Sequence, residues 1–188
     1  MFKRGTVGTL SAAILVLGLA AAPVAWAEER DCKTTLGKIT VDNLRVPAYA
    51  TCRLNGTRVK GTIKVEFGAR LFAQDVIVVG NVQAENHKHV TVEYGSRIGG
   101  SVQIKQGGGA MVRDSRIEGD IQYDDNSVKV SALRNRVGGN IQVVKNTGGV
   151  VIRKNVIDGN LQCKENVPAP TGGGNVVGGN KEDQCRRL

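Results

Sequence analysis

Aromatic residues, prolines and leucines are scarce in this chain of 188 residues. Aromatics make up 4% of the chain, and it has only four prolines and two histidines. From Glu28 onward it holds 33 valines and isoleucines against seven leucines, which excludes helical bundles and coiled coils and favours strands. A hydrophobic content of 40% excludes a wholly disordered chain.

The one long apolar run lies near the N-terminus. A short positive start precedes the apolar stretch 10–22 and a small-x-small signal-peptidase site that ends at Ala27. The run is shorter than the roughly 20 residues that span a bilayer, and it holds no cysteine for a lipid anchor. We predict a signal peptide over 1–27, secretion to the extracellular space or periplasm, and a mature chain, 28–188, without a membrane span.

A glycine recurs once in every 19 or 20 residues of the mature chain. The series is Gly61, Gly80, Gly100, Gly119, Gly139, Gly159 and Gly179. Most of these glycines lie in a unit that reads apolar-x-Gly-Asn/Ser/Asp-apolar-Gln, and repeats of this length are typical of solenoids. We interpret the glycine as a flexible corner residue, or as a residue kept small by a narrow interior. No strand-to-helix pattern follows it, so a nucleotide-binding loop is excluded.

Apolar residues alternate within each repeat and align between repeats in four columns. The columns run from Val59 to Val177, from Ile63 to Leu161, from Leu71 to Val150 and from Ala73 to Ile152. Such a pattern predicts an all-β fold, a single-stranded parallel β-helix, right-handed, with about 20 residues per coil and roughly seven coils. Two other repeat folds fit less well. A leucine-rich repeat requires leucines at fixed positions, and this chain has few leucines. A left-handed hexapeptide helix requires coils whose length is a multiple of six, whereas these repeats have 19 or 20 residues.

Four cysteines allow three pairings. Cys32 and Cys52 are 20 residues apart, which is one coil, and Cys163 and Cys185 are 22 apart. Stacked coils place such pairs within the Cα separation of roughly 4.4 to 6.8 Å that a disulfide needs, whereas the other pairings would bridge several coils. We predict Cys32–Cys52 and Cys163–Cys185, and no metal site, because no Cys-x-x-Cys is present.

The glycine-rich tail, about 164–188, is predicted to fold across the last coil as a cap. Open strand edges at the end of a solenoid invite further pairing. A cap and two terminal disulfides favour a discrete rod over an open polymer.

Three segments carry a resemblance to known proteins. They are Asp42-Asn43-Leu44-Arg45-Val46-Pro47, Gly159-Asn160-Leu161-Gln162-Cys163-Lys164-Glu165-Asn166 and Gly172-Gly173-Gly174-Asn175-Val176-Val177-Gly178-Gly179-Asn180-Lys181. With them the chain resembles a group of exported bacterial β-solenoid proteins, which implies an export signal, a parallel β-helix and no assigned reaction. It has a distant likeness to bactofilins, β-helices that polymerise, but those lack export signals and disulfide-closed ends.

Outward amides recur once per coil. The first series is Gln83, Gln103, Gln122, Gln142 and Gln162, and a second is expected at Asn86, Gln106, Asn126, Asn146 and Asn166. Stacked amides hydrogen-bond along a cross-β axis, so we interpret both series as structural. The alternative is a flat amide face that binds sugar hydroxyls. The threonines form no sustained column, which argues against an ice-binding surface.

Arginines form a stripe beside one apolar column. Arg58, Arg97, Arg116 and Arg136 precede that column, with Arg113, Arg134 and Arg153 at an adjoining corner. Without Lys3 and Arg4 the formal charge falls from +9 to +7. Like charges one strand apart repel, so an anionic polymer would stabilise the stripe, although long arginines also splay into solvent. The predicted partner is an acidic polysaccharide or another envelope polyanion, and not nucleic acid, because aromatics are not interleaved.

An enzyme is the alternative, because polysaccharide lyases and hydrolases also use parallel β-helices. Glu118, Asp120, Asp124 and Asp125 form the only dense acidic patch in the sequence, but Asp120 occupies an ordinary repeat position. His87 and His89 lack a nearby catalytic partner, and the repeats lack the insertions that wall a groove. We predict a non-catalytic binding or structural module without a cofactor.

Overall fold

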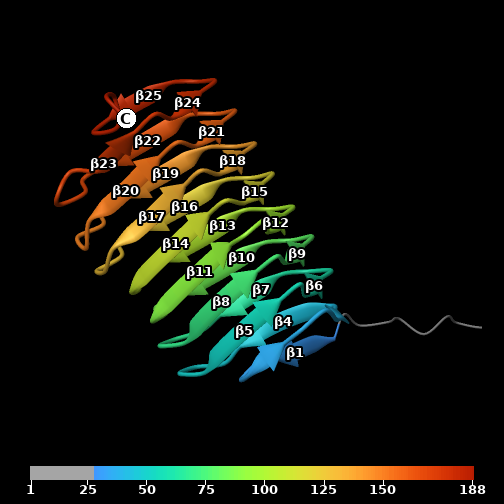
Figure 1. The fold of residues 1–188 in the computed structure, drawn as a ribbon. Helices are drawn as coiled ribbons and strands as arrows, with labels where there is room; N and C mark the ends of the chain where they lie inside the picture. The colour runs from blue at the N-terminus through green and yellow to red at the C-terminus, as the bar shows by residue number, and fades with distance from the viewer. Residues whose placement is uncertain (1–27) are drawn as a thin grey trace, which may run out of the picture.

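Three parallel sheets run along the molecule, and each coil contributes one strand to each sheet (Figure 1). The computed structural model describes residues 28–188. Sheet A contains, in spatial order, β1 (Glu29–Asp31), β4 (Asn43–Val46), β7 (Ile63–Val65), β10 (Val82–Glu85), β13 (Val102–Lys105), β16 (Ile121–Asp124), β19 (Ile141–Val144), β22 (Leu161–Lys164) and β25 (Lys181–Asp183).

Sheets B and C have eight strands each. Sheet B contains β2 (Thr35–Leu36), β5 (Thr51–Asn55), β8 (Arg70–Gln74), β11 (His89–Glu93), β14 (Gly109–Arg113), β17 (Val130–Leu133), β20 (Val150–Arg153) and β23 (Thr171–Gly173). Sheet C contains β3 (Thr40–Val41), β6 (Arg58–Val59), β9 (Ile77–Val78), β12 (Arg97–Ile98), β15 (Arg116–Ile117), β18 (Arg136–Val137), β21 (Val156–Ile157) and β24 (Val176–Val177).

The predicted all-β solenoid is therefore confirmed, with about seven coils of roughly 20 residues. Residues 28–188 contain no helix, and so none that could cross a membrane. Figure 1 shows the coils stacked from β1 at one end to β25 at the other. The right-handed sense of the coil stays a prediction. The predicted signal peptide, 1–27, lies outside the described residues.

The core is a narrow column of β-branched side chains. In β10, Val82 and Ala84 are buried while Gln83 between them faces outward, and the strands of sheet A from β4 to β22 alternate in the same way. The four predicted columns all line this interior. Tyr123 is the largest buried side chain, and its hydroxyl donates to the Ser131 carbonyl at 2.8 Å. A hydroxyl buried in an apolar core needs such an acceptor.

Both predicted disulfides are present. The Cα atoms of Cys32 and Cys52 lie 5.4 Å apart, and those of Cys163 and Cys185 lie 5.3 Å apart. All four cysteines are buried within the column. Each bond therefore joins one terminal coil to its neighbour.

The C-terminal tail does not fold across the last coil as expected. Strands β23, β24 and β25 pair in parallel with β20, β21 and β22, so the tail extends all three sheets by one further coil. Parallel pairing satisfies the backbone groups along the edge that a crossing segment would have left open. Only 184–188 turn beyond the strands, with Cys185 N donating to Glu182 O at 3.0 Å.

Candidate functional site

A polar side chain follows each recurring glycine, and together with Asn43, which follows Asp42, these side chains form a ladder along the corner between sheets C and A. Its members are Asn43, Thr62, Asn81, Ser101, Asp120, Asn140, Asn160 and Asn180. Each side-chain oxygen accepts the backbone N–H of the next member. Asp120 Oδ1, for example, accepts from Asn140 N at 2.6 Å.

This corner ladder explains the recurring glycine. A Cβ added to Gly139 would lie 2.2 Å from Asp120 Oδ1 and 3.0 Å from the backbone of Gly119. The backbone of Gly139 is not left-handed, so the flexible-corner interpretation is wrong at this position. Glycine is required here because there is no space for a side chain. The space is limited by a polar side chain of the neighbouring coil, and not by a narrow interior as the second interpretation had it.

A second ladder lies inside the column. Asn146 is fully buried, and its Nδ2 donates to Tyr123 O at 3.0 Å and to Asn166 Oδ1 at 2.9 Å. Its Oδ1 accepts from the backbone N and the Nδ2 of Asn126, at 3.0 and 2.9 Å. The outward position expected for these three asparagines is therefore wrong. Buried amides are tolerated here because every coil supplies partners for the next.

Asn86 and Gln106 do not belong to the inner ladder. Both are exposed, with left-handed φ angles of 52° and 47°. In their coils the inner position falls on the next residue, His87 or Gly107, and Gly107 N donates to Asn126 Oδ1 at 3.2 Å. The expected series was displaced because the intervening coil has 19 residues rather than 20.

A third asparagine ladder, at the corner between sheets B and C, was not among the predicted sites. Asn135, Asn155 and Asn175 are buried, and Asn155 donates from both N and Nδ2 to Asn175 Oδ1 at 3.0 Å. Asn155 Nδ2 also donates to Ala132 O at 2.8 Å. The 20-residue spacing of these three asparagines in the sequence could have revealed this ladder. All three ladders join each coil to the next.

His87 lies at an inner-ladder position, but it does not form the hydrogen bonds that the asparagines of other coils form there. Its side chain is 3% exposed, and neither ring nitrogen has a partner among the described residues. The ring fills the space that a side chain at Gly107 would need, because an added Cβ there would lie 2.2 Å from Nδ1. Burial lowers the pKa of His87 to about 4, the backbone of Gly109 partly opposes this shift, and His89 nearby adds to it.

We expect His87 to make the fold sensitive to acid. The unfolded state takes up its proton near pH 6.5 and the folded state only near pH 4, so stability is full above pH 6.5 and falls as the pH drops to 4. The loss is about 3 kcal/mol, at about 1.36 kcal/mol per pKa unit. Denaturant unfolding at both pH values measures it, and the His87→Asn variant should lose this pH dependence. A loss equally large in His87→Asn would contradict the assignment.

The glutamine ladder lies on the outer face of sheet A. Gln83 Nε2 donates to Gln103 Oε1 at 3.0 Å, Gln103 Nε2 donates to Gln122 Oε1 at 3.3 Å, and Gln142 Nε2 donates to Gln162 Oε1 at 3.1 Å. The predicted hydrogen bonding between stacked amides is therefore present at these steps.

The arginine stripe is continuous over three strands of sheet C. Arg97 is in register with Arg116, and Arg116 is in register with Arg136. All three are exposed. Arg58 is also exposed, but Ile77 separates it from Arg97. The structure thus brings three of the four predicted stripe residues together.

The corner arginines have different surroundings. Arg113 Nε lies 2.6 Å from Glu93 Oε2, and its guanidinium stacks 4.6 Å from the centre of the Tyr94 ring. Arg134 makes two hydrogen bonds to Asp114, at 2.7 and 2.6 Å, and these lower the pKa of Asp114. Arg113 is therefore occupied by contacts within sheet B. Arg153 is exposed on β20.

Arg134 joins the stripe at a shallow groove of about 760 Å³. The groove is lined by Gly95, Arg97, Asp114, Ser115, Arg116, Glu118, Arg134 and Arg136. Four guanidinium groups face two carboxylates, so the surface is positive. Arg116 Nε lies 2.6 Å from Glu118 Oε1, and this hydrogen bond lowers the pKa of Glu118. We name this surface the arginine groove.

The acidic residues of the predicted patch do not converge. Glu118 pairs with Arg116, Asp120 belongs to the corner ladder, and Asp124 ends β16 on sheet A. Asp125 follows it, exposed, in a left-handed turn. Within residues 28–188, no three His, Cys, Asp or Glu side chains are grouped so as to hold a metal ion.

Comparisons of the chain with protein-family models, with curated proteins and with solved structures found no match.

Proposed function

We propose that this protein is an exported bacterial β-solenoid that binds acidic polysaccharide, or another envelope polyanion, through the arginine groove. The observation that carries the proposal is the register of Arg97, Arg116 and Arg136 on adjacent strands, with Arg134 lining the same groove. Two disulfides support an oxidising compartment, where envelope and extracellular polysaccharides occur.

The groove suits a polymer better than a small molecule. It is open and shallow, and its arginines follow the long axis of the stack at the strand spacing of about 4.8 Å. A guanidinium group forms paired hydrogen bonds with a carboxylate or sulfate, and several in a row bind repeated acidic groups. Glu118 already pairs with Arg116, and a chain of such groups would relieve the remaining repulsion between the three arginines.

The role we propose is binding without catalysis. A general acid in glycoside hydrolysis needs a raised pKa. The two carboxyl groups of the groove are instead each held by an arginine, Glu118 by Arg116 and Asp114 by Arg134, and their pKa values are lowered. Both therefore remain ionised, and both serve to orient the arginines.

We expect the triple variant Arg97→Ala/Arg116→Ala/Arg136→Ala to bind an acidic polysaccharide such as heparin or polygalacturonate at least about tenfold more weakly. Each exposed ionic contact contributes up to about 1 kcal/mol, and about 1.4 kcal/mol is a tenfold change in affinity. Binding of the unaltered protein should weaken as salt is raised. Calorimetry or biolayer interferometry at two salt concentrations measures both effects.

The matched control is Arg30→Ala/Lys88→Ala/Arg187→Ala, which removes the same charge from exposed positions outside the groove. This control should retain most of the affinity. Equal losses in the two triple variants would mean that net charge, and not the groove, attracts the polymer, and unchanged binding in both would also refute the proposal.

A further inference from the structure

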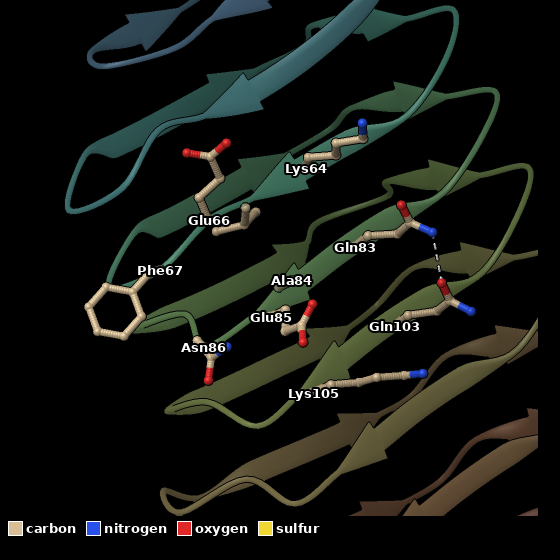
Figure 2. Close-up of a pocket in the computed structure, with 10 residues that line it drawn as sticks. Lys64, Glu66, Phe67, Gln83, Ala84, Glu85, Asn86, Gln103 and Lys105 are labelled. Carbon is tan, nitrogen blue, oxygen red and sulfur yellow. Dashed lines mark hydrogen bonds between the residues drawn. The ribbon is translucent and has the colours of Figure 1, made fainter.

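A second hollow lies on a different sheet from the arginine groove. It has a volume of about 500 Å³ and covers the outer face of β7, β10 and β13 in sheet A. Figure 2 shows two rows of side chains across it, Lys64, Gln83 and Gln103 in one row and Glu66, Glu85 and Lys105 in the other. Phe67 and Asn86 lie in the turns at its margin. We name this surface the sheet A hollow.

The amides of the hollow keep hydrogen-bonding capacity. Gln83 donates to Gln103 (Figure 2), and Gln103 donates to Gln122, so the two amides of the hollow point the same way along the ladder. Each donating amide uses one of its two N–H groups. Within residues 28–188, the Gln83 oxygen, at the start of the series, accepts no hydrogen bond from another side chain. The floor therefore offers both donors and an acceptor to a ligand.

One carboxylate and one ammonium group are also uncommitted. Glu85 and Lys105 are in register on adjacent strands, and neither forms an ion pair within the described residues. Glu66, in contrast, accepts from Ala48 N at 3.1 Å and lies 3.6 Å from Arg45. The positive charges of Lys64 and Lys105 balance the negative charges of Glu66 and Glu85. The hollow therefore has no net charge and favours a neutral ligand.

The margin of the hollow carries two exposed aromatic rings. Phe67 is 55% exposed and Tyr49 is 71% exposed, and their ring centres lie 5.3 Å apart in an edge-to-face contact. The mature chain has only five aromatic residues, and two of them are exposed at this margin rather than buried. An exposed ring beside polar groups is an apolar surface on which the C–H face of a sugar packs.

We propose that the sheet A hollow binds a neutral saccharide. Glu85 and the Gln83 oxygen accept hydrogen bonds from sugar hydroxyls, while Lys105 and the free amide N–H groups donate to sugar oxygens. Phe67 packs against the apolar face of the ring. A saccharide combines these features because every hydroxyl both donates and accepts, and the ligand needs no charge to balance the site. This site is independent of the arginine groove and of the function proposed for it.

The test is calorimetric titration of the mature protein with neutral hexasaccharides of glucose, mannose, galactose, xylose and N-acetylglucosamine. We expect at least one of them to bind. Phe67→Ala and Glu85→Gln should each weaken that binding about tenfold, which corresponds to the loss of one aromatic contact or one hydrogen bond to a charged group. Both side chains are exposed, so the fold should be retained.

Two matched controls separate the hollow from the rest of the surface. Phe72→Ala removes an aromatic ring from sheet B, and Glu165→Gln removes a carboxylate from an exposed turn. Both should bind within about twofold of the unaltered protein, and so should the Arg97/Arg116/Arg136 triple alanine variant. Failure of all the hexasaccharides to bind would overturn the proposal. Binding that survives Phe67→Ala and Glu85→Gln, or that is lost in the arginine variant, would also overturn it.

Discussion

Replacement of Asn146 by leucine is expected to destabilise the protein by about 4 kcal/mol. Asn146 is fully buried and hydrogen-bonded to both the preceding and the following coil, through Asn126 and Asn166. Leucine leaves the backbone N–H and the Nδ2 of Asn126 without their acceptor and the Tyr123 carbonyl without the Nδ2 donor, while Asn166 Oδ1 keeps only the backbone N–H of residue 146. Each buried polar group that loses its partner costs about 1 to 3 kcal/mol.

Guanidinium unfolding under oxidising conditions measures this loss. The matched control is Gln142→Ala, which removes one hydrogen bond of 3.1 Å from the half-exposed outer ladder of the same coil. We expect it to cost less than about 1 kcal/mol, because water replaces the lost partner. Similar losses for Asn146→Leu and Gln142→Ala would mean that the inner ladder stabilises the stack no more than the outer one.

Replacement of Gly139 by alanine is expected to destabilise the protein by about 3 kcal/mol. The added Cβ would lie 2.2 Å from Asp120 Oδ1, which accepts the Asn140 N–H at 2.6 Å. Moving the carboxylate breaks the corner ladder, and moving the coil is resisted by the Gly119 backbone at 3.0 Å. Overpacking of this kind costs about 1 to 3 kcal/mol, to which the lost hydrogen bond adds about 1 kcal/mol.

Gly37→Ala is the matched control for Gly139→Ala. No atom lies within 4 Å of a Cβ added to Gly37, and its backbone is not left-handed. Alanine there should be neutral, or slightly stabilising because it restricts the unfolded chain. Thermal or guanidinium unfolding of both variants compares them. Equal stability of the two variants would show that the repeated glycine is not required by the ladder.

The fold was predictable because its signal repeats. A single repeat of 20 residues would be ambiguous, but the same apolar columns recur from coil to coil, and all four line the interior as predicted. The disulfides followed from the same period, since Cys32 and Cys52 are one coil apart. Coils of nearly constant length, 19 or 20 residues, and a covalent bond of fixed reach leave few alternatives.

The candidate site was predictable only in part. The arginine column was expected from its place beside a buried column, and Arg97, Arg116 and Arg136 do lie in register. The engagement of Arg113 with Glu93 was not expected, because it depends on which outward side chains of adjacent coils face each other. The glutamines of the sheet A hollow were expected as part of the repeated amide series, but its charged and aromatic members were not, since those come from three coils and share no motif.

The amino-acid sequence by itself determined the period, the buried columns and the cysteine pairing, because each of these depends only on distances along a regular coil. The tertiary structure decided which asparagines lie inside, why glycine recurs, and which charged groups remain free. The 19-residue spacing between Gly107 and Asn126 moves the inner position from Asn86 and Gln106 to His87 and Gly107, and no constant period reveals that shift. The space at Gly139 is likewise filled by a side chain of the neighbouring coil, so only the stacked structure shows it.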